Sequence, residues 1–215
     1  MPENPKIYHI THVDNLDGIL SRGGLLSDAR MIAEGGPDHS IGMSKIKERR
    51  LTKIEVPCHP NTYVGEYVPF YYCPRSVMLY LMYRGNHPEL DYDGGQKPIL
   101  HLEIDLHEAI NWANESGIRW ALSFSNAGAY HAEFGCGKKD LRRLDWAAIA
   151  ATDFRDPDVK ENKQAEFLIH GFVPFGLVRR IGVNNWRIHR QVTERLDQYS
   201  SIHRPVVEVI PEWYY

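Results

Sequence analysis

The segment Lys160–His170 reads KENKQAEFLIH and changes from polar to apolar half-way along. Its apolar residues Phe167–Ile169 predict the start of a buried strand. Glu166 stands at the boundary, where a core strand would hold its carboxylate while the carboxylate faces a cleft. A solvated glutamate beside an edge strand is the alternative, because charged residues next to strands are commonly exposed. The segment therefore predicts a strand that begins near Glu166 and leaves the role of this carboxylate open.

Outward from this segment, strands and helices alternate irregularly along the chain. Further strands or apolar strand-like segments are predicted at Ile7–Ile10, Ile99–Ile104, Ile118–Phe124, Leu177–Val183 and Val206–Ile210. Helices are predicted at 14–22, Ser44–Lys53, Arg75–Arg84, Leu106–Asn114, Trp146–Ala151 and 184–196. Because no regular βαβ repeat is present, the fold class expected is α+β.

Several local details follow from residue type. Asp14, Asp145 and Asn184 are interpreted as N-caps, because their short polar side chains accept from free backbone N–H groups. The alternation of apolar and polar residues in 99–104 predicts a half-buried strand. The segments 126–137 and 152–158 are predicted to be loops, the second leading into the Glu166 segment.

The 215 residues suit one large domain or two small ones, and 43% hydrophobic with 25% charged residues is typical of a soluble globular protein. No apolar stretch is as long as a membrane span, and Met1–Pro5 lacks the character of a secretory signal. Cys58, Cys73 and Cys136 are odd in number and far apart, which predicts reduced thiols in a cytoplasm. We therefore expect a cytoplasmic protein that does not associate with membranes.

The net charge of −3 excludes the strongly basic character of a dedicated duplex-binding protein. Basic residues nonetheless gather in three groups. These groups are Lys45, Lys47, Arg49, Arg50 and Lys53; Lys138, Lys139, Arg142 and Arg143; and Arg179, Arg180, Arg187 and Arg190. Local basic patches on a neutral body suit transient contact with a single nucleic-acid strand, and an ordinary solvated surface is the alternative.

Common catalytic and metal motifs do not account for the chain. Neither the pair His9 and His12 nor the pair Cys58 and His59 has the spacing usual for zinc, so no metal is predicted. Cys73 lies in an aromatic run and is interpreted as a small buried hydrophobe. The sequence also lacks GxSxG, Walker and GxGxxG motifs.

The remaining candidates for chemistry are Arg50, Glu166, His9 and the aromatic run. A carboxylate stabilises the oxocarbenium-like centre that forms when a glycosidic bond breaks, and the nicotinamide–ribose bond of NAD follows the same logic. An arginine holds phosphate in a fork geometry, and aromatic rings stack on nicotinamide or a base. The alternative is that Tyr71, Tyr72 and Met78 are core residues.

Four sequence blocks, taken in order, carry a resemblance. They are Tyr8–His12 (YHITH), Glu48–Arg50 (ERR), Val68–Ser76 (VPFYYCPRS) and Gln164–Leu168 (QAEFL). This ordered set resembles DarT, the toxin of the DarT–DarG toxin–antitoxin pair, from about Ile7 to about Glu194. The resemblance implies one ADP-ribosyltransferase domain over 1–215, with two small antiparallel sheets and flanking helices around an NAD cleft.

The resemblance also implies an activity and its participants. We expect a mono-ADP-ribosyltransferase that uses NAD as a substrate, requires no metal and modifies a base of single-stranded DNA, by analogy thymine. The implied partner is a DarG-like antitoxin whose macrodomain removes the modification, and the expected protein is a monomer. The implied catalytic residues are Glu166 and Arg50, and the implied cofactor-binding residues are His9, Thr11, Tyr71 and Lys160.

One segment departs from the family pattern. Many members have a Thr-Asp-Gly-His-like run in the middle loop, where this chain has SNAGA at 125–129 followed by His131. The loop is expected near the acceptor strand, so this change bears on the preferred base and its sequence context. Three alternatives stay open: an NAD-dependent RNA 2′-phosphotransferase, a non-catalytic single-strand-binding module, and a structural or interaction protein.

Overall fold

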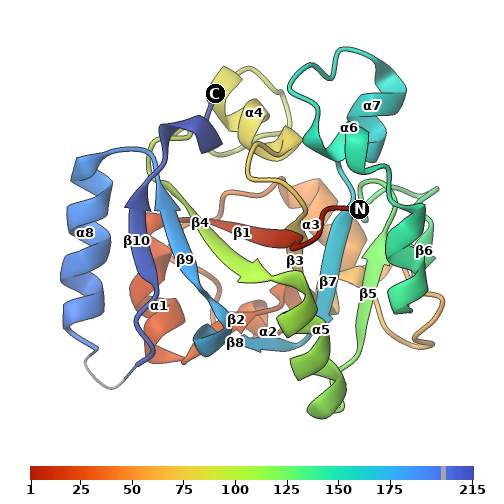
Figure 1. The fold of residues 1–215 in the computed structure, drawn as a ribbon, viewed down its shortest axis with the longest axis horizontal. Helices are drawn as coiled ribbons and strands as arrows, with labels where there is room; N and C mark the ends of the chain where they lie inside the picture. The colour runs from red at the N-terminus through yellow and green to blue at the C-terminus, as the bar shows by residue number, and fades with distance from the viewer. Residues whose placement is uncertain (200–201) are drawn as a thin grey trace.

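The larger sheet contains β7 (Glu166–His170), the strand expected in the KENKQAEFLIH segment. The computed structural model describes residues 1–199 and 202–215. The sheet has eight strands in the spatial order β10 (Val206–Val209), β9 (Arg180–Val183), β4 (Ile99–Asp105), β1 (Lys6–His12), β3 (Tyr67–Tyr71), β7, β5 (Trp120–Ser123) and β6 (Phe134–Gly135) (Figure 1). Neighbours run antiparallel except β9 and β10, which are parallel.

A second sheet is much smaller. It consists of β2 (Gly24–Leu26) paired antiparallel with β8 (Phe172–Pro174). The two expected antiparallel sheets are therefore unequal, and the larger one ends in a parallel pair. The α+β class is confirmed, because helices and mainly antiparallel strands are interspersed along the chain.

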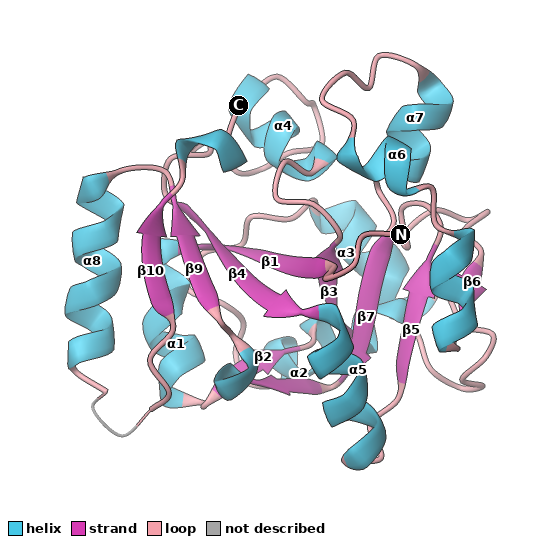
Figure 2. Ribbon diagram, viewed as in Figure 1, coloured by secondary structure: helices cyan, strands magenta, loops and turns pink. Residues whose placement is uncertain are grey.

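Eight α-helices surround the sheets within the described residues (Figure 2). They are α1 (Leu16–Ser21), α2 (Asp28–Ala33), α3 (Ser44–Thr52), α4 (Val77–Arg84), α5 (Leu106–Glu115), α6 (Trp146–Ala150), α7 (Pro157–Asn162) and α8 (Trp186–Asp197). In the view of Figure 1, α5 lies in front of the large sheet while α2 and α3 lie behind it. Helices on two faces explain why most of the sheet is buried.

Helix α8 has the apolar face that its sequence predicts. Ile188, Val192 and Leu196 are all buried, as their four-residue spacing requires. The helix begins one residue later than expected, because Asn185 and not Asn184 accepts from the backbone N–H of Ile188. In Figure 1, α8 lies beyond β10 and covers that end of the sheet, where unpaired backbone groups would otherwise face solvent.

Two other local predictions are wrong. Asp14 is not an N-cap of α1: it belongs to a short 3-10 turn, and its carboxylate accepts from Arg195 at 2.7 Å. Strand β4 is not half-buried, since all its residues but the last are buried. Even Glu103 is only 4% exposed, because Arg180 binds its carboxylate on the face that the alternation predicts to be solvated.

The segment 152–158, predicted to be a loop, contains the start of α7. Asp156 accepts from the backbone N–H groups of Asp158 and Val159 and caps this helix. Pro157 occupies the first turn, where its missing N–H costs nothing. The proline therefore begins a helix here instead of marking a loop. The 126–137 segment likewise contains the short strand β6.

The prediction of three reduced thiols is wrong for two of the cysteines. Cys58 and Cys136 form a disulfide between residues 78 apart in the sequence. The fold brings the segment after α3 beside the end of β6, which spacing alone does not reveal. Cys73 is a free thiol and is buried, as expected for a small hydrophobe.

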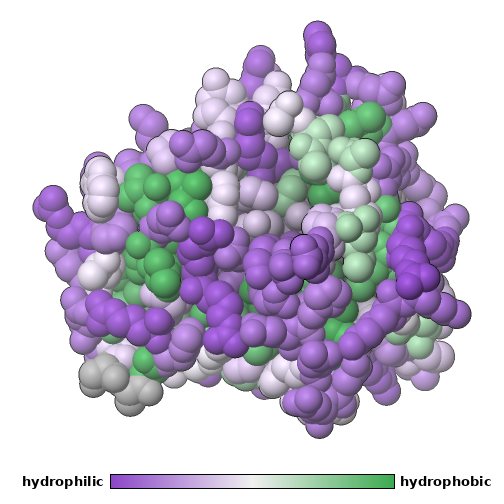
Figure 3. Space-filling model, viewed as in Figure 1, coloured by the Kyte–Doolittle hydropathy of each residue, from purple (hydrophilic) through white to green (hydrophobic). Residues whose placement is uncertain are grey.

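The outer surface is largely polar. Figure 3 shows mostly hydrophilic side chains on one face, with hydrophobic patches that include one over β9 and β10. Across 1–199 and 202–215, we find no helix with both the length and the apolar character needed to cross a bilayer.

Candidate active site

Arg50 and Glu166 form a buried ion pair between α3 and β7. The Nη1 atom of Arg50 donates to Oε1 of Glu166 at 3.0 Å, and Nη2 donates to Oε2 at 2.9 Å. Only 9% of Arg50 and 2% of Glu166 are exposed. Two parallel hydrogen bonds of this kind fix both the position and the orientation of the carboxylate. The structure thus brings together the two residues expected to be catalytic.

Backbone and hydroxyl groups complete the support of Glu166. Its backbone N–H donates to Oγ of Ser123 on β5 at 3.1 Å, and the N–H of Ala127 donates to its Oε1 at 3.1 Å. Ser123 in turn donates to the carbonyl oxygen of Ser125 at 2.6 Å. The middle loop therefore contacts the carboxylate directly, and its first residues belong to the same hydrogen-bonded group.

Burial and charge set the protonation of two neighbouring groups. Burial opposes the charged form of Arg50, but the charge of Glu166 and its hydrogen bonds outweigh that effect and raise the pKa of Arg50. Burial, followed by the negative charge of Glu166, raises the pKa of Tyr71 well above its usual value. Arg50 is therefore a cation and Tyr71 a neutral hydrogen-bond donor across the physiological range.

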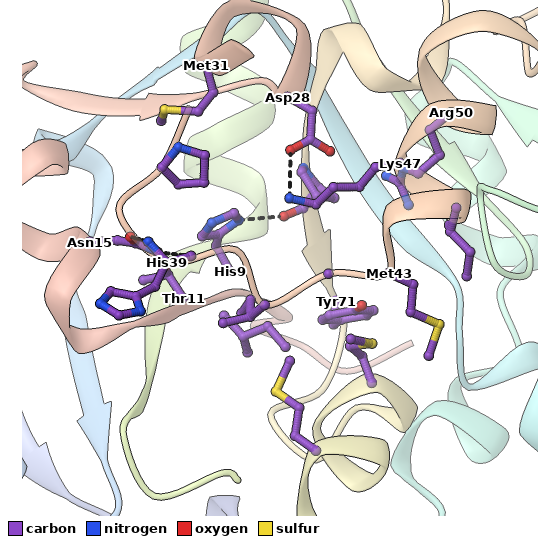
Figure 4. Close-up of a pocket in the computed structure, with 18 of the residues that line it drawn as sticks. His9, Thr11, Asn15, Asp28, Met31, His39, Met43, Lys47, Arg50 and Tyr71 are labelled. Atoms are coloured by element: carbon purple, nitrogen blue, oxygen red, sulfur yellow. Dashed lines mark hydrogen bonds and ion pairs between the residues drawn. The ribbon is translucent and has the colours of Figure 1, made fainter. Parts of the chain in front are cut away.

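A cavity of about 510 Å³ opens beside this pair, a volume typical of ligand pockets. Figure 4 shows His9 and Thr11 on one side of it and Arg50 on the other, with Tyr71 and Lys47 between them. All six expected site residues line this cavity, namely His9, Thr11, Arg50, Tyr71, Lys160 and Glu166. Elements far apart in sequence thus converge on one space.

His9 and Thr11 project from β1, two residues apart and hence on the same face of the strand. Nδ1 of His9 donates to the carbonyl oxygen of Pro69 at 2.9 Å, which leaves Nε2 as an acceptor. Desolvation by burial lowers the pKa of His9, so the ring is neutral at neutral pH. Thr11 is 5% exposed, and its hydroxyl accepts from Asn15 at 3.1 Å.

Lys160 lies in α7, the helix that the sequence did not predict. It is exposed and is one of the residues that line the cavity. Its backbone carbonyl accepts from Nε2 of Gln164 at 3.0 Å, which links α7 to the turn that precedes β7. Lys160 is the most solvent-accessible of the six residues.

Several lining residues were not singled out from the sequence. Nζ of Lys47 lies 3.7 Å from Asp28, and this contact appears as a dashed line in Figure 4. Gln164, inside the QAEFL block, lines the cavity and accepts from Asn126 at 3.4 Å. The place of Gln164 inside the QAEFL block was a usable signal, although Gln164 itself lies in the turn between α7 and β7. Lys47 belongs to a basic group of the sequence, but its contact with Asp28 had no comparable signal, because that contact depends on how α2 meets α3.

Beyond Ala127, the middle loop reaches solvent. Tyr130 is 76% exposed, and Cζ of Arg49 lies 5.0 Å from the centre of its ring. Nε2 of His131 lies 2.9 Å from Oε1 of Glu161. An exposed aromatic ring beside an arginine is a geometry suited to stacking with a nucleic-acid base.

Two groups of three possible metal ligands occur in the described part of the chain. In the group Cys58, His59 and Cys136, the two sulfurs are joined to each other. In the group His12, Asp14 and His39, the carboxylate already accepts from Arg195. Neither group shares a residue with the Arg50–Glu166 pair.

A sequence model described as "ssDNA thymidine ADP-ribosyltransferase, DarT" matches residues 8–215. The chain belongs to the DarT family. This membership confirms the enzyme class expected from the four sequence blocks: the chain is a DNA ADP-ribosyltransferase whose acceptor is thymidine of single-stranded DNA and whose second substrate is NAD⁺. No metal is indicated for DarT proteins.

Relatives support the assignment over the full length. A DNA ADP-ribosyl transferase of Thermus sp. (strain 2.9) is 39% identical over 215 residues, covering 100% of this chain and 98% of the relative. One from Mycobacterium tuberculosis (strain ATCC 25618 / H37Rv) is 30% identical, covering 100% of this chain and 90% of the relative. This chain therefore spans nearly the whole length of both proteins.

Solved DarT structures have the same fold. Thermus sp. 2.9 DarT in complex with ADP-ribosylated ssDNA matches with a TM-score of 0.89 at 38% identity, covering 100% of this chain and 98% of that one. The same protein in complex with NAD⁺ matches with a TM-score of 0.85 at 36% identity, covering 100% and 99%. Thermosipho africanus DarTG in complex with ADP-ribose matches with a TM-score of 0.74 at 17% identity, covering 98% of this chain and 51% of that one, and this supports the fold alone.

Proposed function

We propose that Glu166 and Arg50 carry the transfer reaction in this chain. When the bond between nicotinamide and ribose breaks, its electron pair leaves with nicotinamide, and positive charge develops on the ribose. The Glu166 carboxylate, held in place by Arg50 and by the backbone N–H of Ala127, stabilises that charge. The bidentate Arg50–Glu166 pair at the wall of the cavity is the single observation that carries this proposal. Pre-organised charge of this kind acts without reorganising during the reaction.

We propose that NAD⁺ binds through His9, Thr11, Tyr71 and Lys160. The free Nε2 of His9 accepts a hydrogen bond, and the hydroxyl of Thr11 lies on the same face of β1. The neutral Tyr71 offers a flat ring and a donor beside Glu166. Lys160 supplies a positive charge at the rim for a phosphate oxygen. The complex of Thermus sp. 2.9 DarT with NAD⁺ supports placing NAD⁺ in the matching cavity.

The acceptor thymine is proposed to approach past the middle loop. Ala127 contacts Glu166 and Tyr130 is exposed beside Arg49, so a base stacked on Tyr130 reaches the carboxylate along one path. A paired base hides its edge within the duplex stack. We therefore propose that this path accepts single strands and that the loop sets the sequence context.

The remaining proposals concern the domain, its location, its oligomeric state and its partner protein. We propose one ADP-ribosyltransferase domain over 1–215 that acts as a monomer, and coverage of the edge strand β10 by α8 supports the monomer. The proposed cytoplasmic location rests on the DarT family, because the Cys58–Cys136 disulfide removes the support of reduced thiols. A DarG-like antitoxin is the proposed partner. Membership of the DarT family supports this pairing.

The deciding experiment is incubation of the chain with NAD⁺ and a mixed-sequence single-stranded oligonucleotide, followed by mass spectrometry. The expected product is an oligonucleotide heavier by one ADP-ribose on a thymidine, together with free nicotinamide. A 2′-phosphotransferase would instead remove phosphate from RNA. A non-catalytic binder would retain the oligonucleotide in a salt-dependent manner without consuming NAD⁺, and either result would overturn the proposal.

A further inference from the structure

A second cavity lies on the other side of the catalytic strands. Its volume is about 360 Å³, and none of its lining residues also lines the first cavity. Tyr71 lines the first cavity while the next residue, Tyr72, lines the second, as expected when successive side chains of an extended segment alternate. Lys163, three residues before Glu166, also lines the second cavity.

Lys163 places a buried positive charge against this cavity. The residue is only 3% exposed. Its Nζ atom donates to the carbonyl oxygen of Ile149 at 2.7 Å and to Sγ of Cys73 at 3.4 Å. Burial raises the pKa of Cys73 although the charge of Lys163 lowers it, so the thiol is neutral. Within 1–199 and 202–215, no carboxylate lies within ion-pair distance of Lys163, and a buried charge without a counter-charge is costly.

Two residues that line the same cavity carry further donors without partners. The hydroxyl of Tyr72, a residue 6% exposed, and Nε of Arg75 are both buried without a hydrogen-bond partner among the described residues. The guanidinium of Arg75 lies 4.3 Å from the ring centre of Tyr215. Among the described residues, no aspartate or glutamate lines this cavity. Buried polar groups are normally hydrogen-bonded, so these donors indicate a missing acceptor.

The walls favour a flat molecule. The ring of Tyr72 meets that of Trp146 edge-to-face at 5.4 Å, and Tyr215 and Pro74 add further apolar surface. We infer that this cavity binds a small oxyanion, a phosphate or carboxylate group, attached to a planar ring. The anion would accept from Lys163, Tyr72 and Arg75 while the ring packs against the aromatic walls.

Isothermal titration of the full chain with phenyl phosphate tests this inference. The expected result is one binding event per chain. Tyr72→Phe removes one hydrogen bond and keeps the ring, so affinity should fall about fivefold. Lys163→Met removes the charge and should reduce affinity at least about tenfold. The matched control is Lys47→Met, which removes a cation of the first cavity and should leave phenyl phosphate affinity unchanged.

Absence of binding would overturn the inference, as would binding that Lys47→Met abolishes and Lys163→Met leaves intact. Because Lys163 also contacts Ile149, its variant is checked for folding by circular dichroism. If it is unfolded, Tyr72→Phe alone decides, and an unchanged affinity would then count against the site. A further titration with a single-stranded oligonucleotide present identifies the source of the anion. Displacement of phenyl phosphate supports a phosphate of the DNA strand, and retention supports a free small molecule.

Discussion

Arg50 and Glu166 are 116 residues apart and exchange two hydrogen bonds of 3.0 and 2.9 Å. This contact links α3 to β7, and both charged side chains line the same cavity. The sequence alone leaves open a solvated glutamate beside an edge strand. Because Glu166 is 2% exposed, truncation instead leaves a buried arginine without its partner, which typically costs about 3–5 kcal/mol. Activity and stability must therefore be measured together at this position.

Glu166→Gln should abolish most transfer while the protein stays folded. The amide keeps the shape and one acceptor for Arg50, but it cannot stabilise positive charge on the ribose. We expect the rate at saturating NAD⁺ and DNA to fall by at least about 10²-fold. The matched variant Glu166→Ala should lose activity and also melt at a lower temperature. Transfer by Glu166→Gln at the wild-type rate would remove Glu166 from the proposed reaction.

The disulfide predicts how many cysteine thiols react with a thiol reagent before and after reduction. Under denaturing, non-reducing conditions the chain should react with one equivalent of a thiol reagent, from Cys73, and with three after reduction. Cross-linking residues 78 apart restricts the unfolded chain and stabilises the fold by about 4.5 kcal/mol in the chain-entropy model. Cys58→Ser should therefore lower the free energy of unfolding, measured in urea without reductant. Three reactive thiols before reduction would support the original expectation of reduced cysteines.

The contact between Arg50 and Glu166 was predictable from the sequence, whereas other long-range packing did not follow from local patterns. Glu166 and Arg50 stand in blocks of fixed residue order, so their meeting could be expected. The pairing of Cys58 with Cys136 depends on β6 reaching the segment after α3, and no local pattern encodes that contact. Strand β4 shows a further limit, because the alternation of Ile99–Ile104 describes one face only. The polar residues on its other face are buried because partner side chains bind them, as Arg180 binds Glu103.

Helix boundaries show the limits of single-residue signals. Asp145 caps α6 as expected, but Asp14 forms an ion pair instead of capping α1. The sequence predicts a loop over 152–158, although Pro157 in the first turn is equally typical of a helix start. In these cases the residue types permitted two conformations, and tertiary contacts selected one.

His101 should make stability depend on pH. It is fully buried, and desolvation lowers its pKa to about 4, whereas an unfolded histidine titrates near pH 6.5. Unfolding therefore takes up a proton between these values, and stability falls as the pH is lowered from 6.5 to 4. The expected loss is about 3 kcal/mol, measured by urea unfolding across this range. His101→Gln keeps a donor for the carbonyl of Pro74 and should show a smaller loss over the same interval; equal losses would contradict this assignment.

Adjacent arginines on α3 should give different phenotypes. Successive residues on a helix point about 100° apart, and the structure places Arg50 on Glu166 while Arg49 lies over Tyr130. Arg50→Lys keeps the charge but cannot form both parallel hydrogen bonds. We expect its rate at saturating NAD⁺ and DNA to fall by about 10²-fold.

Arg49→Ala should instead leave the saturated rate nearly unchanged and weaken DNA binding, with a smaller loss at high salt, where surface charges are screened. Rates and DNA affinities of both variants, measured at two salt concentrations, separate the two roles. Tyr130→Ala is the companion variant, because removing the ring should produce a similar DNA-binding defect through lost stacking. An inactive Arg49→Ala beside a merely salt-sensitive Arg50→Lys would mean that Arg49 and not Arg50 faces the reacting ribose, and the assignment of the buried pair to catalysis would have to be abandoned.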